Sequence, residues 1–315
     1  MPKGTLYIDA ALTNVAVAYK NTNYIGSQIF PSIDVAKQSG KVYKFGKDAF
    51  RLETDVRAPG TKSNRVQSYS VSTDTYYCDN HALHDVVPIE DAENADTAVQ
   101  PEMATTEGLV EMMAVRREYS IASYLFNTTT FASYYAALSG TDRWDDYEQS
   151  DPIAKADAAI ESVRTKSGAK ANTAIMGAAV YIKLRRHPQL LDMFKYTAGG
   201  ILSEAQVAEA LGVDRILIGR AIYNAAQEDT TPTFTGTDIW GKYCLFCYIA
   251  PVAGLRKPSL GYSYRWKTGV GGYEVYKTVD MSAGGVHGTI VEAMNYFDDI
   301  VHGLDFGYLY STVVS

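Results

Sequence analysis

The sequence predicts an α+β protein in which a compact α/β unit is inserted into a discontinuous outer unit. Three observations lead to this prediction. Residues 64–77 alternate larger side chains with serine at the period of a strand. Residues 101–127 carry apolar side chains at helical spacing, and residues 151–250 alternate short apolar strands with short helices. Strand-like alternation returns after residue 251, so both ends of the chain are expected to belong to the outer unit.

The composition restricts the class of protein. The chain has 315 residues, of which 46% are hydrophobic, so it can bury a large core and is not globally disordered. Its formal net charge is -7, whereas a protein that coats nucleic acid is normally basic. Its three cysteines, Cys78, Cys244 and Cys247, are too few for a disulfide framework. No apolar leader or membrane span is recognisable, so we expect a soluble protein made in the cytoplasm without a membrane partner.

The first quarter of the chain is expected to form an N-terminal arm over 1–33 and an extended loop over 34–80. The arm is mostly extended, with a short helix near Leu12–Tyr19. The loop reads as a hairpin with strands at 41–52 and 64–77, each able to reach about 50 Å at about 3.3 Å per residue. Such a polar hairpin is marginal by itself in water, so we expect it to project onto another molecule.

Charges divide this region into two blocks of opposite sign. Between Asp34 and Arg65, eight basic residues stand against four acidic ones, a net charge of +4. The basic residues are Lys37, Lys41, Lys44, Lys47, Arg51, Arg57, Lys62 and Arg65. From Val66 to Val115 there are ten acidic residues and no Lys or Arg, a net charge of -10. The blocks are either chance clusters on solvated faces or surfaces that meet, within one molecule or between two.

A long helix is predicted over about 101–127, after an acidic linker at 88–102. Pro101 suits the first helical turn, and the helix dipole favours the acidic side chains near the start of the helix. Its expected apolar stripe consists of Val110, Met113, Ile121, Tyr124 and Leu125.

The inserted unit at 151–250 has clear helix signals. Asp151 followed by proline is a typical N-cap, and Ser203 with Gln206 forms a capping box. The unit would sit within an outer unit made of 81–150 and 251–315.

Candidate ligands and nucleophiles are sparse. Cys244 and Cys247 have CxxC spacing, but the residues between them are apolar and no second pair completes a zinc site, which favours a buried strand. The densest group of possible metal ligands consists of Cys78, His81, His84 and Asp85. A metal-dependent enzyme using this group is the alternative from a different class. No nucleophile elbow, phosphate loop or zinc-protease motif is present, so we expect no catalytic residue, no metal site and no cofactor.

Short local blocks carry a resemblance to a known family. They are Asn23-Tyr24-Ile25-Gly26-Ser27-Gln28-Ile29-Phe30-Pro31 followed by Lys37-Gln38-Ser39-Gly40-Lys41-Val42-Tyr43-Lys44, then Ile218-Gly219-Arg220-Ala221, Asp238-Ile239-Trp240-Gly241-Lys242 and Pro258-Ser259-Leu260-Gly261-Tyr262. Their order over nearly the whole chain resembles the major capsid proteins of tailed bacteriophages, which have the Hong Kong 97 fold. An encapsulin-like compartment shell is the alternative within that fold.

The resemblance implies an L-shaped subunit with the arm, the extended loop, a peripheral domain around the spine helix and an axial domain at 151–250. It implies a homo-oligomer of hexamers and pentamers, assembled in the host cytoplasm into the icosahedral shell of the virion. The shell would enclose double-stranded DNA without sequence-specific binding. A portal and a separate scaffolding protein are expected partners, since only about thirty residues precede the loop.

Within such a shell we expect the basic loop to lie over an acidic zone of the adjacent subunit. The expected acidic residues are Asp85, Glu90, Asp91, Glu93, Asp96, Glu102, Glu107 and Glu111.

Overall fold

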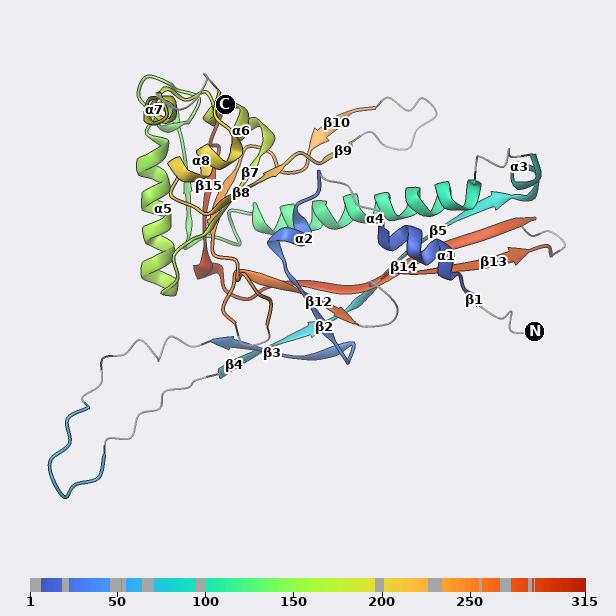
Figure 1. The fold of residues 1–315 in the computed structure, drawn as a ribbon, viewed down its shortest axis with the longest axis horizontal. Helices are drawn as coiled ribbons and strands as arrows, with labels where there is room; N and C mark the ends of the chain where they lie inside the picture. The colour runs from blue at the N-terminus through green and yellow to red at the C-terminus, as the bar shows by residue number, and fades with distance from the viewer. Residues whose placement is uncertain are drawn as a thin grey trace.

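The structure is a computed structural model in which one long helix runs between a six-stranded and a five-stranded sheet (Figure 1). Two further two-stranded sheets occur among the described residues, one of them formed by β9 (Ile222–Asn224) and β10 (Gly236–Asp238). The structure describes residues 7–18, 23–45, 52, 55–63, 71–94, 100–195, 201–225, 234–254, 257–266, 273–282, 285 and 287–315. Among these residues, no helix is both long and apolar enough to cross a membrane.

The larger sheet contains six strands among the described residues. They are β1 (Tyr7–Ile8), β2 (Ser32–Val35), β5 (Asp79–Pro88), β12 (Gly261–Trp266), β13 (Tyr273–Asp280) and β14 (Gly288–Val301). β14 is the centre of the sheet because it pairs antiparallel with β5, β12 and β13. β1 and β2 are added at the outer sides of β13 and β12. Helix α1 (Ala10–Ala18) confirms the short helix expected in the arm.

Helix α4 (Pro101–Leu125) lies along one face of this sheet and confirms the predicted spine helix. Its 25 residues correspond to about 38 Å at 1.5 Å per residue. Leu109, Val110 and Met113 pack with α1 against Val275 and Val291 of the sheet. One residue of the expected stripe differs: Tyr124 is 50% exposed, because it lies at the margin of the buried face next to Leu125.

The smaller sheet has five strands among the described residues, in the order β6 (Tyr135–Ala137), β15 (Gly307–Ser311), β11 (Cys244–Cys247), β7 (Thr173–Gly177) and β8 (Arg215–Gly219). The helices around it are α5 (Pro152–Ser167), α6 (Ala178–Leu184), α7 (Pro188–Met193) and α8 (Glu204–Ala210). The predicted caps are confirmed: Asp151 accepts a hydrogen bond from the N–H of Ala154 at 2.9 Å, and Ser203 and Gln206 form a capping box.

Two strands of the smaller sheet lie outside the range expected for it. β6 and β15 belong to parts of the sequence expected in the outer unit, yet both pair within the smaller sheet. The physical reason is that Leu309 and Tyr310 are both buried, one in each of the two cores that flank this sheet. A strand that is apolar on both faces needs a central position, and β15 finds it between β11 and β6.

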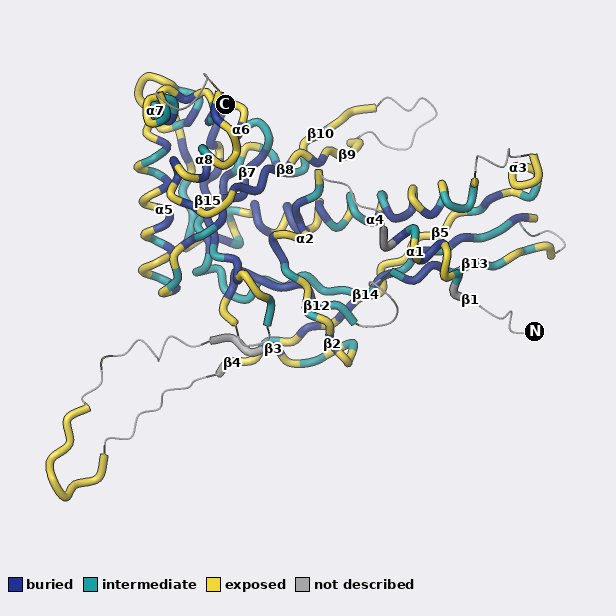
Figure 2. The backbone as a smooth tube through the Cα atoms, viewed as in Figure 1, coloured by how far each residue is buried: buried dark blue, intermediate teal, exposed yellow. Residues whose placement is uncertain are grey.

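The extended loop begins as a two-stranded hairpin of β3 (Ser39–Phe45) and β4 (Val71–Tyr77). Its base is anchored: Val42 and Tyr76 are buried, and the ring of Tyr76 stacks on Tyr264 at 4.9 Å. Beyond the base, residues 55–63 are exposed throughout and lie away from the rest of the subunit (Figure 2).

The region after the hairpin is more regular than expected. The polar stretch beginning at Asp79 is the ten-residue strand β5, and part of the expected acidic linker forms helix α3 (Ile89–Asn94). β5 pairs with β14 over its whole length, and this pairing explains why a polar stretch is a strand. The local sequence did not indicate it because the paired residues are 200 or more positions apart.

Candidate functional site

The basic residues of the extended loop lie on the hairpin and beyond it. Lys37 and Lys41 are exposed at the start of the hairpin, and Arg57 and Lys62 are exposed in the segment 55–63. None of these four side chains forms an ion pair with another described residue. Of the remaining predicted residues, only the backbone of Lys44 is described, in β3. Lys47, Arg51 and Arg65 lie outside the described residues.

The acidic residues gather at the opposite end of the subunit. Those that are exposed are Asp85 in β5, Glu90, Asp91 and Glu93 in α3, and Glu107 in α4. Helix α3 lies at the end of the six-stranded sheet farthest from the β3–β4 hairpin (Figure 1). The described basic residues and this exposed acidic group therefore do not meet within one molecule.

Two of the predicted acidic residues already have partners within the subunit. Glu102 accepts a hydrogen bond from the Lys277 ammonium at 2.6 Å, and Glu111 accepts one from the Tyr24 hydroxyl. Both contacts hold α4 in place and reduce what these carboxylates offer to a neighbour. Asp96 lies outside the described residues.

A buried carboxylate that the sequence analysis missed joins three distant segments. Glu118 of α4 is 3% exposed. Its Oε1 accepts hydrogen bonds from the backbone N–H of Ile25 at 2.9 Å and from the indole N–H of Trp240 at 2.8 Å. Its Oε2 accepts one from the N–H of Gly26 at 2.9 Å. Glu118 therefore ties the spine helix to the arm and to the chain that enters the smaller sheet.

The charge state of Glu118 follows from its partners. All three partners are N–H donors, so a proton on this carboxyl group would find no acceptor among them. Burial raises the pKa of Glu118, and the hydrogen bonds from Ile25, Gly26 and Trp240 oppose that rise. The geometry thus favours the charged form at neutral pH.

Two glycines make room for this contact. A Cβ on Gly26 would lie 2.7 Å from Glu118 Oε2, and a Cβ on Gly219 would lie 2.0 Å from Cγ of Trp240. These glycines and Trp240 come from three of the sequence blocks quoted above, which therefore converge on one point in space. A signal for Glu118 exists in the sequence: it lies three residues before Ile121, on the apolar stripe of the helix, where a charged side chain needs buried partners.

A second polar contact ties α4 to the larger sheet. The Arg117 guanidinium donates from Nε and Nη2 to the two oxygens of Asp299 at 2.9 and 2.8 Å, and from Nη2 to the Ser263 hydroxyl at 2.9 Å. It also lies over the ring of Phe297, 4.6 Å from the centroid. This bidentate geometry fixes the helix against β14 and β12.

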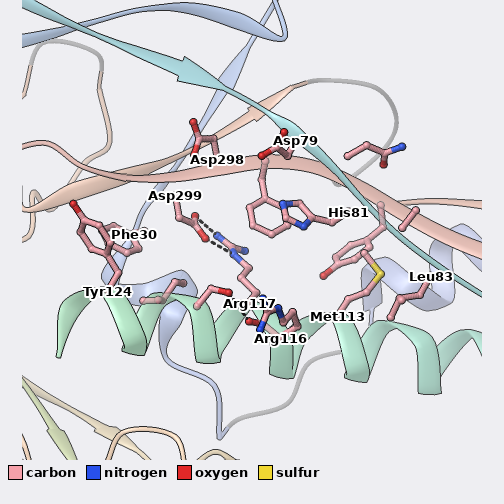
Figure 3. Close-up of a pocket in the computed structure, with 16 residues that line it drawn as sticks. Phe30, Asp79, His81, Leu83, Met113, Arg116, Arg117, Tyr124, Asp298 and Asp299 are labelled. Atoms are coloured by element: carbon pink, nitrogen blue, oxygen red, sulfur yellow. Dashed lines mark hydrogen bonds and ion pairs between the residues drawn. The ribbon is translucent and has the colours of Figure 1, made fainter. Parts of the chain in front are cut away.

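A pocket of about 580 Å3 opens beside this pair, between α4 and the strands β5 and β14 (Figure 3). His81 of β5 stacks on Phe297 with ring centroids 4.2 Å apart, and Leu83 lies further along the same strand. Arg116 and Tyr124 of α4 line the opposite wall.

The proposed metal ligands are not brought together. His81 and His84 are three residues apart in a strand, so their side chains leave opposite faces of the sheet. Cys78 is buried and its thiol donates to the carbonyl oxygen of Tyr264 at 3.5 Å. No cluster of three potential ligands occurs among the described residues.

The CxxC cysteines belong to the core. Cys244 and Cys247 lie in β11 and pack into two different apolar clusters on the two faces of the sheet. Burial raises the pKa of both thiols far above the usual range, which disfavours the reactive thiolate.

In one serine–histidine contact the hydrogen bond runs in the wrong direction for catalysis. Ser150 Oγ lies 2.9 Å from Nε2 of His187, a residue that is 1% exposed. The backbone N–H of Gln189 donates to His187 Nδ1 at 3.3 Å, which places the ring proton on Nε2. The histidine therefore donates to the serine and does not activate it as a nucleophile.

Comparison with known proteins identifies the family. No protein-family model matches the chain. The major capsid protein of Burkholderia phage BcepMu is 32% identical over 312 residues, which cover 97% of this chain and 96% of the relative. The chain belongs to the phage major capsid proteins. The major capsid protein of Pseudomonas phage JBD67 is 28% identical over 98% of the chain.

Solved structures confirm the fold of this capsid protein. A phage-related protein from Bordetella bronchiseptica RB50 has a TM-score of 0.76 at 24% identity and covers 98% of both chains. The capsid of cyanophage P-SCSP1u has a TM-score of 0.61 at 11% identity, covering 93% of this chain and 89% of the other. The predicted Hong Kong 97 fold is thus confirmed. The SrpI encapsulin of Synechococcus elongatus PCC 7942 shares the fold at a TM-score of 0.55 and 11% identity. Membership in a family of shell proteins assigns the chain a structural role and not an enzymatic one.

Proposed function

We propose that this capsid protein assembles from hexamers and pentamers into the icosahedral head of a tailed phage, enclosing double-stranded DNA without reading its sequence. Whole-length similarity to a phage major capsid protein supports the proposal. We further propose assembly in the host cytoplasm with a separate scaffolding protein and a portal. The domains that we propose are the arm at 1–33, the extended loop at 34–80, the peripheral domain, mainly at 81–150 and 251–315, and the axial domain, mainly at 151–250.

The contact that we propose to hold the shell together is the basic loop of one subunit on the acidic end of the next. The observation that carries this proposal is that the described loop residues are exposed and unpaired in their own subunit, while the exposed acidic group lies at the opposite end. Each exposed ion pair is worth only about 0.2–1 kcal/mol. Repetition around a closed lattice multiplies such weak contacts through effective concentration.

Charge reversal tests this contact. The triple variant Lys41→Glu, Lys44→Glu and Lys47→Glu should fold as a subunit but form few shells under the electron microscope. Adding the substitutions Asp85→Lys, Glu90→Lys and Asp91→Lys to the triple variant, in the same chain, should restore part of the assembly at low salt. Normal shells from the lysine variant at both low and high salt would show that these charges do not carry the contact.

The encapsulin-like alternative is supported by likeness of fold alone. The contents of purified particles separate the two: packaged DNA supports a phage head, whereas packaged enzyme supports a compartment shell.

A further inference from the structure

Strand β5 has an open outer edge. In the described residues it pairs with β14 and with no other strand. The protecting side chains of this edge lie towards its ends, at Asp79, Asp85 and Pro88, and the residues between the two aspartates include no lysine and no proline. An open edge of this length is a template for another extended chain.

The register shows which backbone groups point outward. The N–H of Ile89 donates to the carbonyl of His287 at 3.1 Å, which continues the β5–β14 ladder beyond its last pair, Pro88 with Gly288. Hydrogen-bonded pairs alternate along an antiparallel ladder, so the odd-numbered residues of β5 bond to β14 and the even-numbered residues face outward. Pro88, which has no N–H, is even-numbered and therefore fits this assignment.

Three outward donors remain free among the described residues. They are the N–H groups of Asn80, Ala82 and His84, which the register directs away from β14 and which make no hydrogen bond outside the strand pairing. The outward N–H of Val86 is already taken by the Asp85 carboxylate at 2.8 Å. The open edge is thus a row of three donors, each with a carbonyl beside it, and it ends at Asp85.

A groove runs beside this edge. The pocket between α4 and β5 is lined by Ala82 and Leu83 on the strand side and by Met113 and Tyr124 on the helix side. Leu83 is 40% exposed and Tyr124 is 50% exposed, so the groove offers apolar surface to a strand laid along β5 (Figure 3).

The extended loop offers a complementary strand. Val56 is 79% exposed and Leu52 is 102% exposed, so both side chains have apolar surface that a contact with another molecule can bury. Residues 55–58 pair with no strand among the residues that the structure describes, and they are followed by Pro59, which cannot donate to a ladder. Arg57 is exposed and positively charged, which complements the exposed carboxylate of Asp85 on a second copy of the chain.

We propose that residues 55–58 of a second copy of this chain add as a strand to the outer edge of β5, with Val56 in the groove beside α4. The inference rests on the proposed function, because it takes the loop to lie on a neighbouring subunit. The inference goes beyond charge attraction, because it specifies which backbone groups of β5 would bond to the loop of the neighbouring subunit.

Proline at an outward position tests the register. Ala82→Pro removes one outward N–H and leaves the pairing of His81 and Leu83 with β14 intact. Loss of one such bond weakens each contact about threefold to tenfold, so the yield of closed shells should fall by at least that factor. The matched control, Ala82→Val, keeps the N–H and should assemble like the unmodified protein. Normal assembly of a folded Ala82→Pro variant would overturn the strand addition.

Amide hydrogen exchange on the unmodified protein provides a test that needs no variant. A four-residue strand presents two carbonyls to the edge, so two neighbouring amides among residues 80, 82 and 84 should exchange fast in the free subunit and slowly in shells, whereas those of 81 and 83 should be protected in both. Fast exchange at the three even positions in shells would refute the proposal. If lysine reversal abolishes assembly while exchange at these positions stays fast, the charge contact stands and the strand addition fails.

Discussion

Replacing Glu118 by glutamine is the sharpest test of how this subunit is held together. The carboxylate accepts three N–H groups from the arm and from Trp240, and the residue is 3% exposed. Glutamine has the same shape but only one oxygen. If that oxygen keeps the donors Ile25 and Trp240, the new NH2 group faces the N–H of Gly26, and a buried donor loses its acceptor.

The magnitude follows from these contacts. Hydrogen bonds to a charged group contribute about 1.5–3 kcal/mol, those between neutral groups about 0.5–1.5, and a buried unsatisfied donor costs about 1–3. Removing a buried charge offsets part of the loss. We expect Glu118→Gln to lower the free energy of unfolding by about 2 kcal/mol, and Glu118→Ala, which strands all three donors, by about 4 kcal/mol.

Urea unfolding of the unassembled subunit measures this difference, with Trp240 as a fluorescent reporter inside the contact. Glu107→Gln is the matched control, because Glu107 is exposed on the same helix and its change should stay within about 0.5 kcal/mol. If Glu118→Gln unfolds at the same urea concentration as the control, the carboxyl group is not a charged acceptor of three bonds, and the reasoning is refuted.

Two further predictions concern packing and pH. Gly219→Ala should lower the free energy of unfolding by about 3 kcal/mol, because the new Cβ would lie 2.0 Å from Trp240 Cγ. Gly108→Ala, which has open space around it in α4, should raise the free energy of unfolding by about 0.8 kcal/mol. Equal midpoints for the two variants in thermal unfolding would contradict this. Burial lowers the pKa of His187 from 6.5, so the unfolded chain binds the proton more readily and stability should fall as pH drops below about 6.5. His187→Gln should make the plot of unfolding free energy against pH shallower by up to about 1.4 kcal/mol per pH unit, and an unchanged slope would rule out a buried neutral histidine.

Local signals in the sequence predicted the elements that form through local interactions. The spine helix begins at Pro101 as expected, because proline suits the first turn of a helix. The capping box of α8 was equally readable, since its two partners are three residues apart. Each of these features depends on neighbours in the chain, so the sequence carries it directly.

Long-range pairings were the features that local patterns did not predict. β15 joins the smaller sheet because β11 leaves a buried position beside it, and β5 is a strand because β14 lies alongside. Glu118 stands on an apolar stripe, but its three donors come from segments about 90 and 120 residues away. No local pattern specifies which distant N–H groups will arrive there.

The candidate contact surfaces divide in the same way. The sequence alone determined that a basic block precedes an acidic one and that the loop is short of core residues. Only the tertiary structure decided that the exposed members of the two blocks lie at opposite ends of the subunit, and that Glu102 and Glu111 are engaged within it. Charge is a property of each residue and is read from its letter, whereas the direction in which a surface or a strand edge points depends on every pairing in the fold.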